Sequence, residues 1–252
     1  MVVVDNASRD DSAGVARALG VKVVESPANL GFGRAANLGA ASTAGGYLLV
    51  ANPDTKLAPG SLARMVATMA AGPRVGCVGP HLCNPDGSDY PTGRRFPSLG
   101  VGAAHALLAP VWPSNPATRR YHLADLDRSR PVPVDWVSGA CMLLRRAAFD
   151  QVGGFDPAFF MYFEDMDLCL RLAKAGWQVI YDSAAEVEHV VGGSTRTAPY
   201  RKVLHHHRST LRFYRRRYAG DPRVLLTPLV AAGLAVRAAA SLARAAARRR
   251  RG

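Results

Sequence analysis

Three carboxylates follow directly after an aromatic run in this chain. Residues 159–163 are Phe-Phe-Met-Tyr-Phe, and Glu164, Asp165 and Asp167 begin a helix predicted over 164–175. Acidic residues are common in a first helical turn because the helix dipole and the free backbone amides favour negative charge there. That structural role does not explain the aromatic run, which would crowd apolar groups against the acids and raise a carboxyl pKa towards the range of a general base. The pattern therefore predicts acid–base chemistry at this helix start.

A further acid follows a predicted strand. The apolar residues 47–51 end in an Asn-Pro-Asp sequence at Asp54, and ligands of open α/β sheets bind beyond the carboxyl ends of the strands. Asp54 offers the oxygen that a hard divalent cation prefers. The alternative is a turn, with Asp54 capping the next helix. His189 comes after another predicted strand, at 179–181, and is either a metal ligand or a structural histidine.

Short apolar runs alternate with helical patterns along most of the chain. This alternation is typical of an α/β fold with a doubly wound, mainly parallel sheet. Periodicity fades between residues 84 and 133, which are rich in Gly and Pro and are predicted to form a long functional or mobile loop. The predicted strands are at 2–4, 21–24, 47–51, 75–78 and 179–181, with a regular apolar segment at 136–144, and the predicted helices are at 10–19, 33–44, 59–71, 146–152, 164–175 and 200–218.

The positive charge of the chain is concentrated near its C-terminal end. Lys and Arg number 32 against 19 Asp and Glu, a net charge of +13, and many of the arginines lie beyond residue 200. The apolar run at 224–236 is predicted to be too short to span a bilayer. In the last predicted helix Arg237, Arg244 and Arg248 share one face above an Ala/Leu face, which suits an anionic membrane surface.

This distribution divides the chain into an α/β domain at 1–199 and a basic, amphipathic, membrane-associating helical tail at 200–252. No signal-peptide pattern and no run of about 18 apolar residues is found, so we expect a cytoplasmic protein held peripherally on the inner face of the plasma membrane. No nucleic acid partner is predicted, because residues 1–200 lack the basic and aromatic excess that a nucleic-acid-binding face would need. The four cysteines show no metal-site spacing, which favours buried free thiols.

The order of these motifs along one chain resembles the inverting family 2 glycosyltransferases, which have the GT-A fold. The match extends over residues 1–215. Its motifs in chain order are Asp-Asn-Ala-Ser from Asp5, Asn-Leu-Gly-Phe-Gly-Arg-Ala-Ala-Asn from Asn29, Asn-Pro-Asp ending at Asp54, Trp-Val-Ser-Gly-Ala from Trp136, Phe-Glu-Asp-Met-Asp-Leu from Phe163, and His189. The resemblance implies an enzyme that uses a nucleotide sugar.

Within that family the resemblance is to actinobacterial rhamnosyltransferases of cell-wall synthesis. The stretches that support it are residues 86–91, 95–99, 105–116 and 162–165, mostly in the middle of the chain, where acceptor specificity is expected to be set. This branch implies transfer of L-rhamnose from dTDP-L-rhamnose to decaprenyl-diphospho-N-acetylglucosamine, a polyprenyl-diphospho-sugar acceptor, in synthesis of the arabinogalactan linker. Transfer of another nucleotide sugar to a different polyprenyl or O-antigen acceptor is the alternative within the family.

The resemblance also implies roles for the acidic motifs. Asp165 is the general base that deprotonates the acceptor hydroxyl, and Glu164 and Asp167 orient the acceptor and the base. Asp54 binds Mg²⁺ or Mn²⁺, and His189 completes the metal shell. The metal would stabilise the departing nucleoside diphosphate as a Lewis acid.

The residues implied to bind the substrates lie mainly in the earlier motifs. Asp5 contacts the nucleobase, and Arg34 lies near the nucleotide. The other residues expected to bind substrate are Asn6, Asn29, Asn37, Trp136 and Gly139.

The chain departs from the family pattern in two places. Family members normally open with a strand and a helix before the strand that is here at 2–4, so we expect this chain to lack the first β-α unit, which lines the nucleotide pocket. Asn52 replaces the first acid of the usual Asp-x-Asp metal motif, as is common in the rhamnosyl branch. An inactive, membrane-associated homologue is therefore a further alternative.

Overall fold

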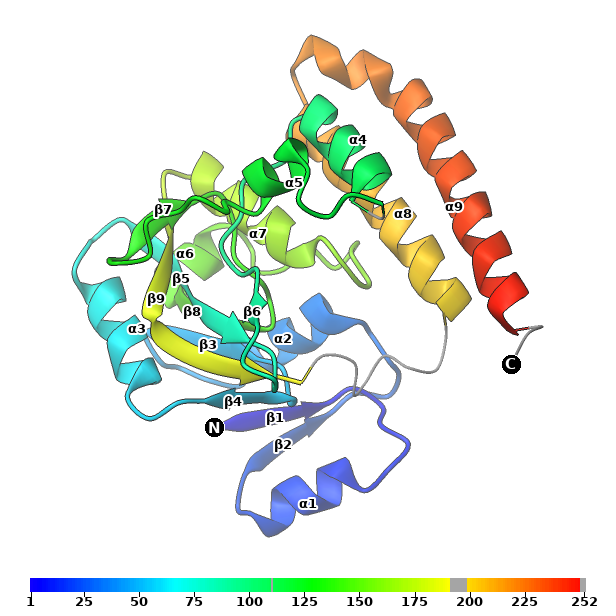
Figure 1. Cartoon of the computed structure of the whole chain (residues 1–252). Coiled ribbons are helices and arrows are strands. Elements are labelled where there is room, and N and C mark those ends of the chain that lie inside the picture. The colour runs from blue at the N-terminus through cyan, green and yellow to red at the C-terminus, as the bar shows by residue number, and fades with distance from the viewer. Residues whose placement is uncertain (110, 191–198, 250–252) are drawn as a thin grey trace. The chain divides into compact units, whose positions relative to one another are not determined.

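The computed structural model describes residues 1–109, 111–190 and 199–249, without the side chains of residues 199 and 244–249 (Figure 1). Contacts divide the chain into two compact units. The first unit contains residues 1–43 and 155–167 together with the described part of 192–252. The second unit contains residues 44–154 and the described part of 168–191.

The N-terminal part of the first unit is a single β-α-β element. Strands β1 (Val2–Asp5) and β2 (Lys22–Glu25) pair in parallel, and helix α1 (Ser12–Ala18) connects them. Helix α2 (Phe32–Ala41) packs on β1 at a glycine, because a Cβ at Gly39 would lie only 3.0 Å from the side chain of Val4. The strands and helices predicted for this region are thus present close to their predicted positions.

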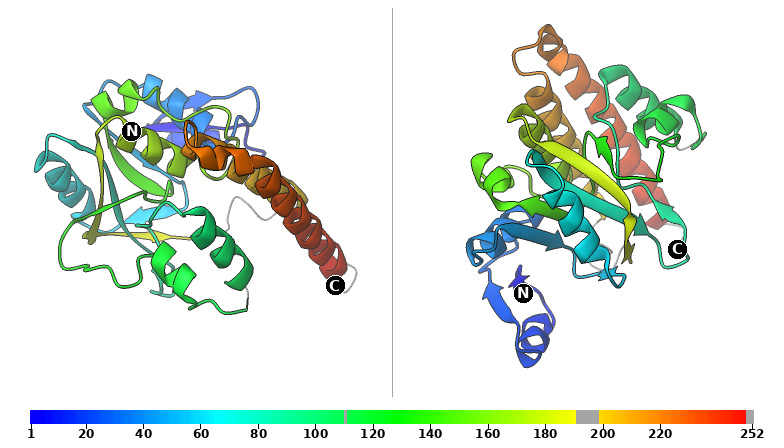
Figure 2. Two further views of the ribbon diagram at one scale, coloured as in Figure 1. Left: turned by 90° about the horizontal axis from the view of Figure 1, so that it is seen from above. Right: turned by 90° about the vertical axis from the view of Figure 1, so that its left-hand side faces the viewer.

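The C-terminal helices belong to this first unit. Helix α8 (Pro199–Arg217) is followed by a short 3-10 helix, η1 (Pro222–Leu226), and by α9 (Thr227–Arg249), and α8 and α9 lie side by side (Figure 2). By its contacts α8 groups with residues 155–167 rather than standing apart as a tail. The boundary predicted between residues 199 and 200 lies next to the undescribed residues and stays a prediction.

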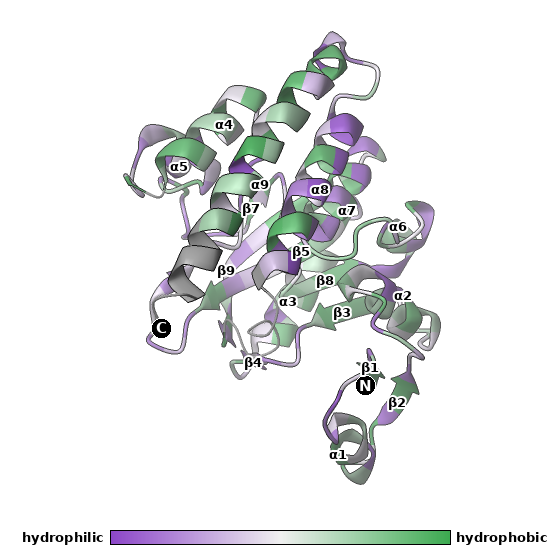
Figure 3. Ribbon diagram, turned by 90° about the vertical axis from the view of Figure 1, so that its right-hand side faces the viewer, coloured by the Kyte–Doolittle hydropathy of each residue, from purple (hydrophilic) through white to green (hydrophobic). Residues whose placement is uncertain are grey.

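The apolar C-terminal segment is longer than the run predicted at residues 224–236. Within Pro222–Ala243 an 18-residue window has a mean hydropathy of 1.7, and none of that window is buried in the structure, so by length and composition this 22-residue segment could cross a membrane. The apolar surface does not end at Val236, because a string of alanines continues it past Arg237 (Figure 3). The predicted arginine face cannot be compared with the structure in full, because the side chains of Arg244 and Arg248 lie outside the described part.

A seven-stranded sheet forms the centre of the second unit. Its strand order is β3-β8-β5-β9-β4, with β6 beside β5 and β7 beside β9. The strands are β3 (Tyr47–Ala51), β4 (Thr55–Leu57), β5 (Val75–Cys83), β6 (Asp89–Tyr90), β7 (Val132–Val134), β8 (Cys141–Arg145) and β9 (Gln178–His189). The α/β class is confirmed.

The sheet is mixed, so the prediction of a mainly parallel sheet is wrong. Among the strand pairs of this sheet, only β5 and β9 run parallel. The β-α-β alternation does give β3 and β5 the same direction, since both pair antiparallel with β8. A strand from much later in the chain is inserted between them, and sequence alternation alone does not reveal such an insertion.

Helix α3 (Ser61–Ala70) covers one face of this sheet. Met65 and Met69 are fully buried against Val78 and Leu143, in a core of closely packed apolar side chains. Asp182 of β9 is also fully buried, and it accepts hydrogen bonds from Arg64, at 3.0 Å, and from Thr68 on α3. These bonds satisfy a carboxylate that would otherwise be costly to bury, and they attach the helix to the long strand β9.

The region predicted to be a long loop contains two helices. Helix α4 (Leu99–Leu108) begins at Ser98, whose side chain accepts a hydrogen bond from the Val101 amide. Helix α5 (Pro116–Tyr121) begins at Asn115, which accepts from the Thr118 amide. Both starts are typical side-chain caps, so the caps carry the helix signal that the Gly- and Pro-rich composition hides. The remaining helices are α6 (Arg146–Gln151) and α7 (Glu164–Lys174).

Candidate active site

The start of α7 is preceded by strained backbone. Tyr162 and Phe163 have φ angles of 67° and 68°, in the left-handed region that non-glycine residues rarely adopt. Each such residue costs on the order of 1–3 kcal/mol and persists only where its surroundings enforce the conformation, and such strain is often found at functional sites. This left-handed segment ends at the first turn of α7, where the Phe163 carbonyl accepts a hydrogen bond from the Asp167 backbone N–H at 2.8 Å. The same helix carries Glu164 and Asp165.

Helix α8 holds this strained segment in place. The Ser209 hydroxyl donates to the Met161 carbonyl at 2.9 Å. The Phe160 ring stacks on His205 with a centroid distance of 4.6 Å, and Phe163 packs against Phe213 at 5.7 Å. One hydrogen bond and two ring contacts therefore fix the backbone immediately before the predicted catalytic acids.

Arg216 of α8 forms ion pairs with two aspartates of the same unit. Its Nη1 donates to both carboxylate oxygens of Asp167, at 2.8 and 3.0 Å, and its Nη2 donates to Asp156 at 2.6 Å. The Asp167 side chain has no exposed surface. Asp167 therefore anchors α8 through a buried, charge-assisted pair, and its predicted role in orienting the acceptor and the base stays a prediction.

The two acids before Asp167 have different surroundings. Glu164 is 8% exposed, and its Oε2 has no hydrogen-bond partner in the described structure. Burial, and then the charge of Asp165, raise the pKa of Glu164 to about 8, so Glu164 is mostly protonated at neutral pH. Asp165 is more exposed, and its Oδ1 atom accepts a hydrogen bond from the Met166 backbone N–H at 2.7 Å. The raised pKa expected for this motif is thus found at Glu164.

The motif that begins at Asn29 meets the loop after β1. Asn6 donates to the Asn29 side chain and to the Gly31 carbonyl, both at 3.3 Å, and accepts from the Leu30 amide at 2.8 Å. Asp5 accepts the amide of Ser8 at 3.2 Å. The structure therefore brings Asn6 and Asn29 together.

Helix α2 is held against the segment that leads to α7. The Asn37 side chain both donates to and accepts from the backbone of Phe155, at 2.8 and 2.9 Å. These two bonds give Asn37 a structural role, and its predicted role in substrate binding stays a prediction. The exposed Arg34 donates through Nε to the Pro157 carbonyl at 3.2 Å. A side chain at Gly31 would collide with the Phe160 carbonyl, at 2.2 Å, which explains this glycine of the motif.

Asp54 and His189 are brought together in the second unit. The antiparallel pairing of β4 with β9 places Thr55 opposite His189, and the Asp54 carbonyl accepts the Val190 amide at 2.9 Å. The His189 Nε2 atom lies 3.3 Å from the Asp54 Oδ1 atom and 3.4 Å from the Asn52 Nδ2 atom. Strand β9 thus runs to His189, well past the end predicted at residue 181.

The chemistry of this pair fits a divalent cation. The Asp54 Oδ1 atom is buried without a hydrogen-bond partner in the described structure. If the His189 Nε2 atom accepts a hydrogen bond from the Asn52 side chain, it carries no proton to donate to Asp54. The lone pair of this nitrogen then faces a lone pair of the Asp54 Oδ1 atom, unless a cation or a proton lies between them. A spacing of 3.3 Å suits two ligands of one ion, since metal–nitrogen and metal–oxygen distances are about 2.0–2.2 Å.

No third His, Cys, Asp or Glu side chain joins this pair among residues 1–109, 111–190 and 199–249. Mg²⁺ and Mn²⁺ sites are often completed by water and by substrate phosphates, so two protein ligands are sufficient for such a site. Asn52 lies at the edge of this site, and its backbone N–H donates a hydrogen bond to the Ala140 carbonyl at 2.8 Å. This bond brings the segment that contains Gly139 next to the metal-site candidates.

Trp136 lies in a neighbouring cluster of rings in this unit. It is 4% exposed, its Nε1 donates to the Arg95 carbonyl at 3.1 Å, and the guanidinium of Arg94 lies over its ring at 4.7 Å. Tyr90 connects this cluster to the metal-site candidates, because its ring meets His189 edge-on at 5.6 Å. Trp136 and Gly139 stay predicted substrate-binding residues.

Sequence reasoning missed Arg216, Ser209 and Arg94. The signal for the first two was present, because Ser209, Phe213 and Arg216 recur at the four- and three-residue spacing of one helix face. The basic residues of α8 instead led to the prediction of a membrane-associating tail. Arg94 gave no signal, since two of its three ring partners, Tyr121 and Trp136, come from distant parts of the chain.

Comparison with known proteins identifies the family. Residues 1–153 match the model "Glycosyl transferase family 2", and residues 117–244 match "Glycosyl transferase family group 2". The chain belongs to glycosyl transferase family 2, and it is a glycosyltransferase. It is 42% identical over 250 residues to the N-acetylglucosaminyl-diphospho-decaprenol L-rhamnosyltransferase of Mycobacterium tuberculosis strain H37Rv, an alignment that covers 94% of this chain and 81% of the relative.

Solved structures of glycosyltransferases share the fold. The mannosyltransferase PcManGT from Pyrobaculum calidifontis, solved with GDP-Man and Mn²⁺, aligns with a TM-score of 0.56 at 18% identity, covering 98% of this chain and 65% of that one. GalNAc-T7, solved with UDP, GalNAc and Mn²⁺, aligns with a TM-score of 0.55 at 18% identity, and the match covers 75% of this chain and 37% of the other. The GT-A fold predicted for this chain is confirmed.

The raised pKa of Glu164 predicts a pH-dependent loss of stability. The unfolded chain releases this proton as the pH rises past about 4.5, whereas the folded chain keeps it up to about 8. Between these values the wild type should lose stability relative to Glu164→Gln, by on the order of a few kcal/mol. Urea unfolding of both proteins across this pH range measures the difference. The exposed Glu186→Gln variant is the control, and a Glu164→Gln difference that does not change with pH would contradict the assignment.

Proposed function

We propose that this chain transfers L-rhamnose from dTDP-L-rhamnose to a polyprenyl-diphospho-N-acetylglucosamine acceptor in cell-wall linker synthesis. The observation that carries the proposal is the identity of 42% over 94% of the chain with a rhamnosyltransferase whose name specifies a decaprenyl-diphospho-N-acetylglucosamine acceptor. The motif residues of the acidic helix start and of the Asp54–His189 pair supply chemistry that fits this reaction. Transfer of another nucleotide sugar is the alternative.

Asp165 is the general base of the proposed reaction. It removes the proton from the acceptor hydroxyl while that oxygen forms a bond to the anomeric carbon of rhamnose. The bond from that carbon to the diphosphate breaks on the opposite side, and the electron pair leaves with dTDP. Glu164 has a pKa of about 8 and is already protonated at neutral pH, so it orients the acceptor as a hydrogen-bond donor and leaves the proton transfer to Asp165.

Asp54 and His189 hold the divalent cation of the reaction, either Mg²⁺ or Mn²⁺. When bound, such an ion supplies Lewis-acid stabilisation of the negative charge on the leaving diphosphate. Asp54 contributes the charge and His189 a neutral nitrogen, so Asp54 is the stronger contributor to binding. Their burial limits competition by water.

The substrate-binding roles follow the order of the family motifs. Asp5 contacts the nucleobase, and Arg34 binds near the nucleotide. Both side chains are accessible in the first unit, Arg34 being exposed and Asp5 partly exposed. Asn6 and Asn29 shape the same loop through their mutual hydrogen bond.

The C-terminal helices attach the enzyme to an anionic membrane surface on the cytoplasmic side. Leu225, Leu229 and Val236 are each more than two-thirds exposed, and arginines flank this apolar surface. Apolar burial together with basic charge favours peripheral attachment to an anionic leaflet, at about 1 kcal/mol for each arginine near the surface. A spanning arrangement of Pro222–Ala243 is the alternative that its length allows.

A donor screen tests the proposed function. The protein is incubated with a short-chain polyprenyl-diphospho-N-acetylglucosamine and with dTDP-L-rhamnose, UDP-galactofuranose or UDP-glucose, and product is detected by mass spectrometry. We expect product from dTDP-L-rhamnose at least about tenfold faster than from the other donors. Preference for a different donor would sustain the enzyme class and refute the rhamnosyl assignment.

Metal removal tests the Asp54–His189 site. EDTA should abolish transfer by the wild type, and added Mn²⁺ or Mg²⁺ should restore it. Asp54→Asn should need a much higher metal concentration, and His189→Ala should show a smaller defect, because the imidazole carries no charge. The exposed Asp150→Asn variant of the same unit is the control. Activity that is unaffected by EDTA would overturn the metal site.

Deletion of residues 224–252 tests the membrane attachment. Intact protein should co-sediment with anionic liposomes, and the deleted protein should not. Salt should release a peripheral protein because it screens the arginine charges, whereas a spanning helix would stay bound in high salt. Equal sedimentation of the intact and deleted proteins would refute attachment through α9.

A further inference from the structure

Arg94 lies among three aromatic rings in the second unit. Its guanidinium carbon is 4.7 Å from the Trp136 ring centroid, 5.8 Å from Tyr90 and 5.9 Å from Tyr121. Its Nε donates to the Pro91 carbonyl at 2.9 Å, which fixes the plane of the group. The terminal nitrogens of this half-buried side chain are therefore held in one orientation.

This cation has no counter-charge in the part of the chain that the structure describes. No carboxylate among residues 1–109, 111–190 and 199–249 forms an ion pair with Arg94, whereas Arg64, Arg119, Arg128 and Arg216 all have one. Aromatic faces offset part of the cost of withdrawing a guanidinium from water, but they leave its net charge in place. A fixed guanidinium with unused donors is suited to bidentate binding of phosphate.

The place of Arg94 in the unit indicates which phosphate it binds. A single ring, that of Tyr90, separates its guanidinium from His189 of the metal-site candidates. Tyr121 and His105, whose rings are 4.9 Å apart, connect the same cluster to α4 and α5. Arg94 thus lies between the metal-site candidates and the α4–α5 region.

The C-terminal end of α4 and the residues Val111 and Trp112 that follow it are apolar and exposed. Leu107 is 73% exposed, Val111 83% and Trp112 52%, and apolar residues extend along the helix (Figure 3). Exposed apolar groups of this kind, grouped at one end of an element and including a tryptophan, are typical of contact with lipid or with another apolar partner. A ligand that combines a diphosphate with a hydrocarbon chain matches a fixed arginine beside such a surface.

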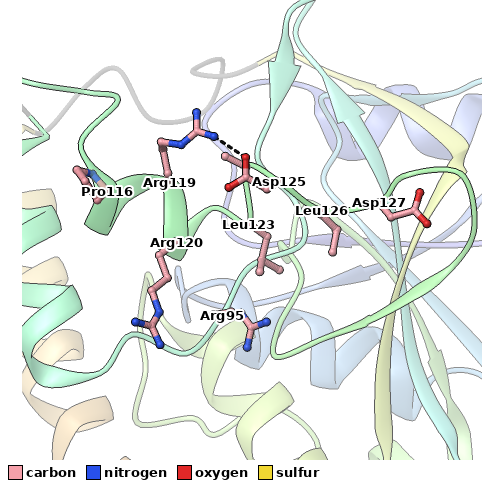
Figure 4. A pocket seen from close by; sticks show the side chains of 9 residues that line it. Arg95, Pro116, Arg119, Arg120, Leu123, Asp125, Leu126 and Asp127 are labelled. Atoms are coloured by element: carbon pink, nitrogen blue, oxygen red, sulfur yellow. Dashed lines mark hydrogen bonds and ion pairs between the residues drawn. The ribbon is translucent and has the colours of Figure 1, made fainter.

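A hollow of about 630 Å³ adjoins this region and adds basic charge. Arg95, Arg119 and Arg120 line it together with Asp125 and Asp127 (Figure 4). Arg119 is already paired with Asp125, and all three arginines are exposed to solvent. The hollow therefore contributes a positive rim, and Arg94 is the preorganised cation.

We propose that Arg94 binds the diphosphate of the lipid-linked acceptor, with the exposed end of α4 facing its hydrocarbon chain. The inference rests on the proposed function, which supplies an acceptor of this chemistry, and it assigns the acceptor diphosphate to Arg94, which lies outside the sequence motifs named above. Positive potential in the cluster agrees with it, because burial and then the charges of Arg94 and His105 lower the pKa of His122 to about 4.

Acceptor kinetics test this site. Arg94→Gln and Arg94→Lys are compared with the wild type, using a short-chain polyprenyl-diphospho-N-acetylglucosamine and dTDP-L-rhamnose. We expect Arg94→Gln to raise the acceptor KM by about tenfold or more. Arg94→Lys should raise it less, since lysine keeps the positive charge but loses the planar guanidinium that binds a phosphate through two hydrogen bonds. The KM for the donor should not change. Arg130→Gln, which removes an exposed arginine of the same unit, is the control.

Two further measurements separate the possible failures. Thermal unfolding shows whether the Arg94→Gln variant is folded. If that variant does not fold, the Arg94→Lys variant is used for the comparison with the wild type. Direct binding of the acceptor lipid, without donor, examines Arg94 even if the donor assignment is wrong. Unchanged acceptor affinity in a folded variant would overturn the inference, as would a rise in the donor KM alone. A wild type that neither binds nor uses this acceptor would refute the proposed function.

Discussion

The double ion pair of Arg216 is the interaction on which the proposed catalytic segment depends. It fixes α8 to Asp167 in the first turn of α7 and to Asp156 before the aromatic run. Removing one partner of such a buried pair typically costs about 3–5 kcal/mol, because the remaining charge is left uncompensated. This attachment, with the bond from Ser209, keeps Tyr162 and Phe163 in the left-handed conformation that leads into Glu164 and Asp165. Helix α8 therefore helps to position the proposed catalytic segment.

The carboxylates of the two candidate sites have different surroundings, and these surroundings suit them to different chemical roles. Glu164 is buried among apolar groups and holds its proton, whereas Asp165 is more exposed and is available as a base. In the second unit, strand pairing brings Asp54 to His189 with an unsatisfied oxygen, which suits a cation. In the proposed mechanism, aspartate thus serves as proton acceptor, metal ligand or structural anchor according to its partners.

The sequence was sufficient for the features that depend on local pattern. The motifs located the acids at the start of α7 and the Asp54 turn, and the apolar runs located most strands. It was insufficient where distant segments meet, because no local signal places β8 between β3 and β5 or Arg216 on Asp167. Helices α4 and α5 were missed because their apolar and proline-rich composition hides ordinary caps at Ser98 and Asn115. The length of α9 was underestimated because Arg237 was taken as its apolar limit.

The central claim is that Asp165 deprotonates the acceptor during rhamnosyl transfer. The most direct test compares the rate of rhamnose transfer by the wild type and by Asp165→Asn at saturating substrate, together with the affinity of each protein for dTDP-L-rhamnose. The account predicts a loss of roughly 10²- to 10⁴-fold in kcat with nearly unchanged donor affinity, since the base acts on the acceptor alone. A variant that binds the donor normally and retains more than about a tenth of the wild-type rate would contradict it.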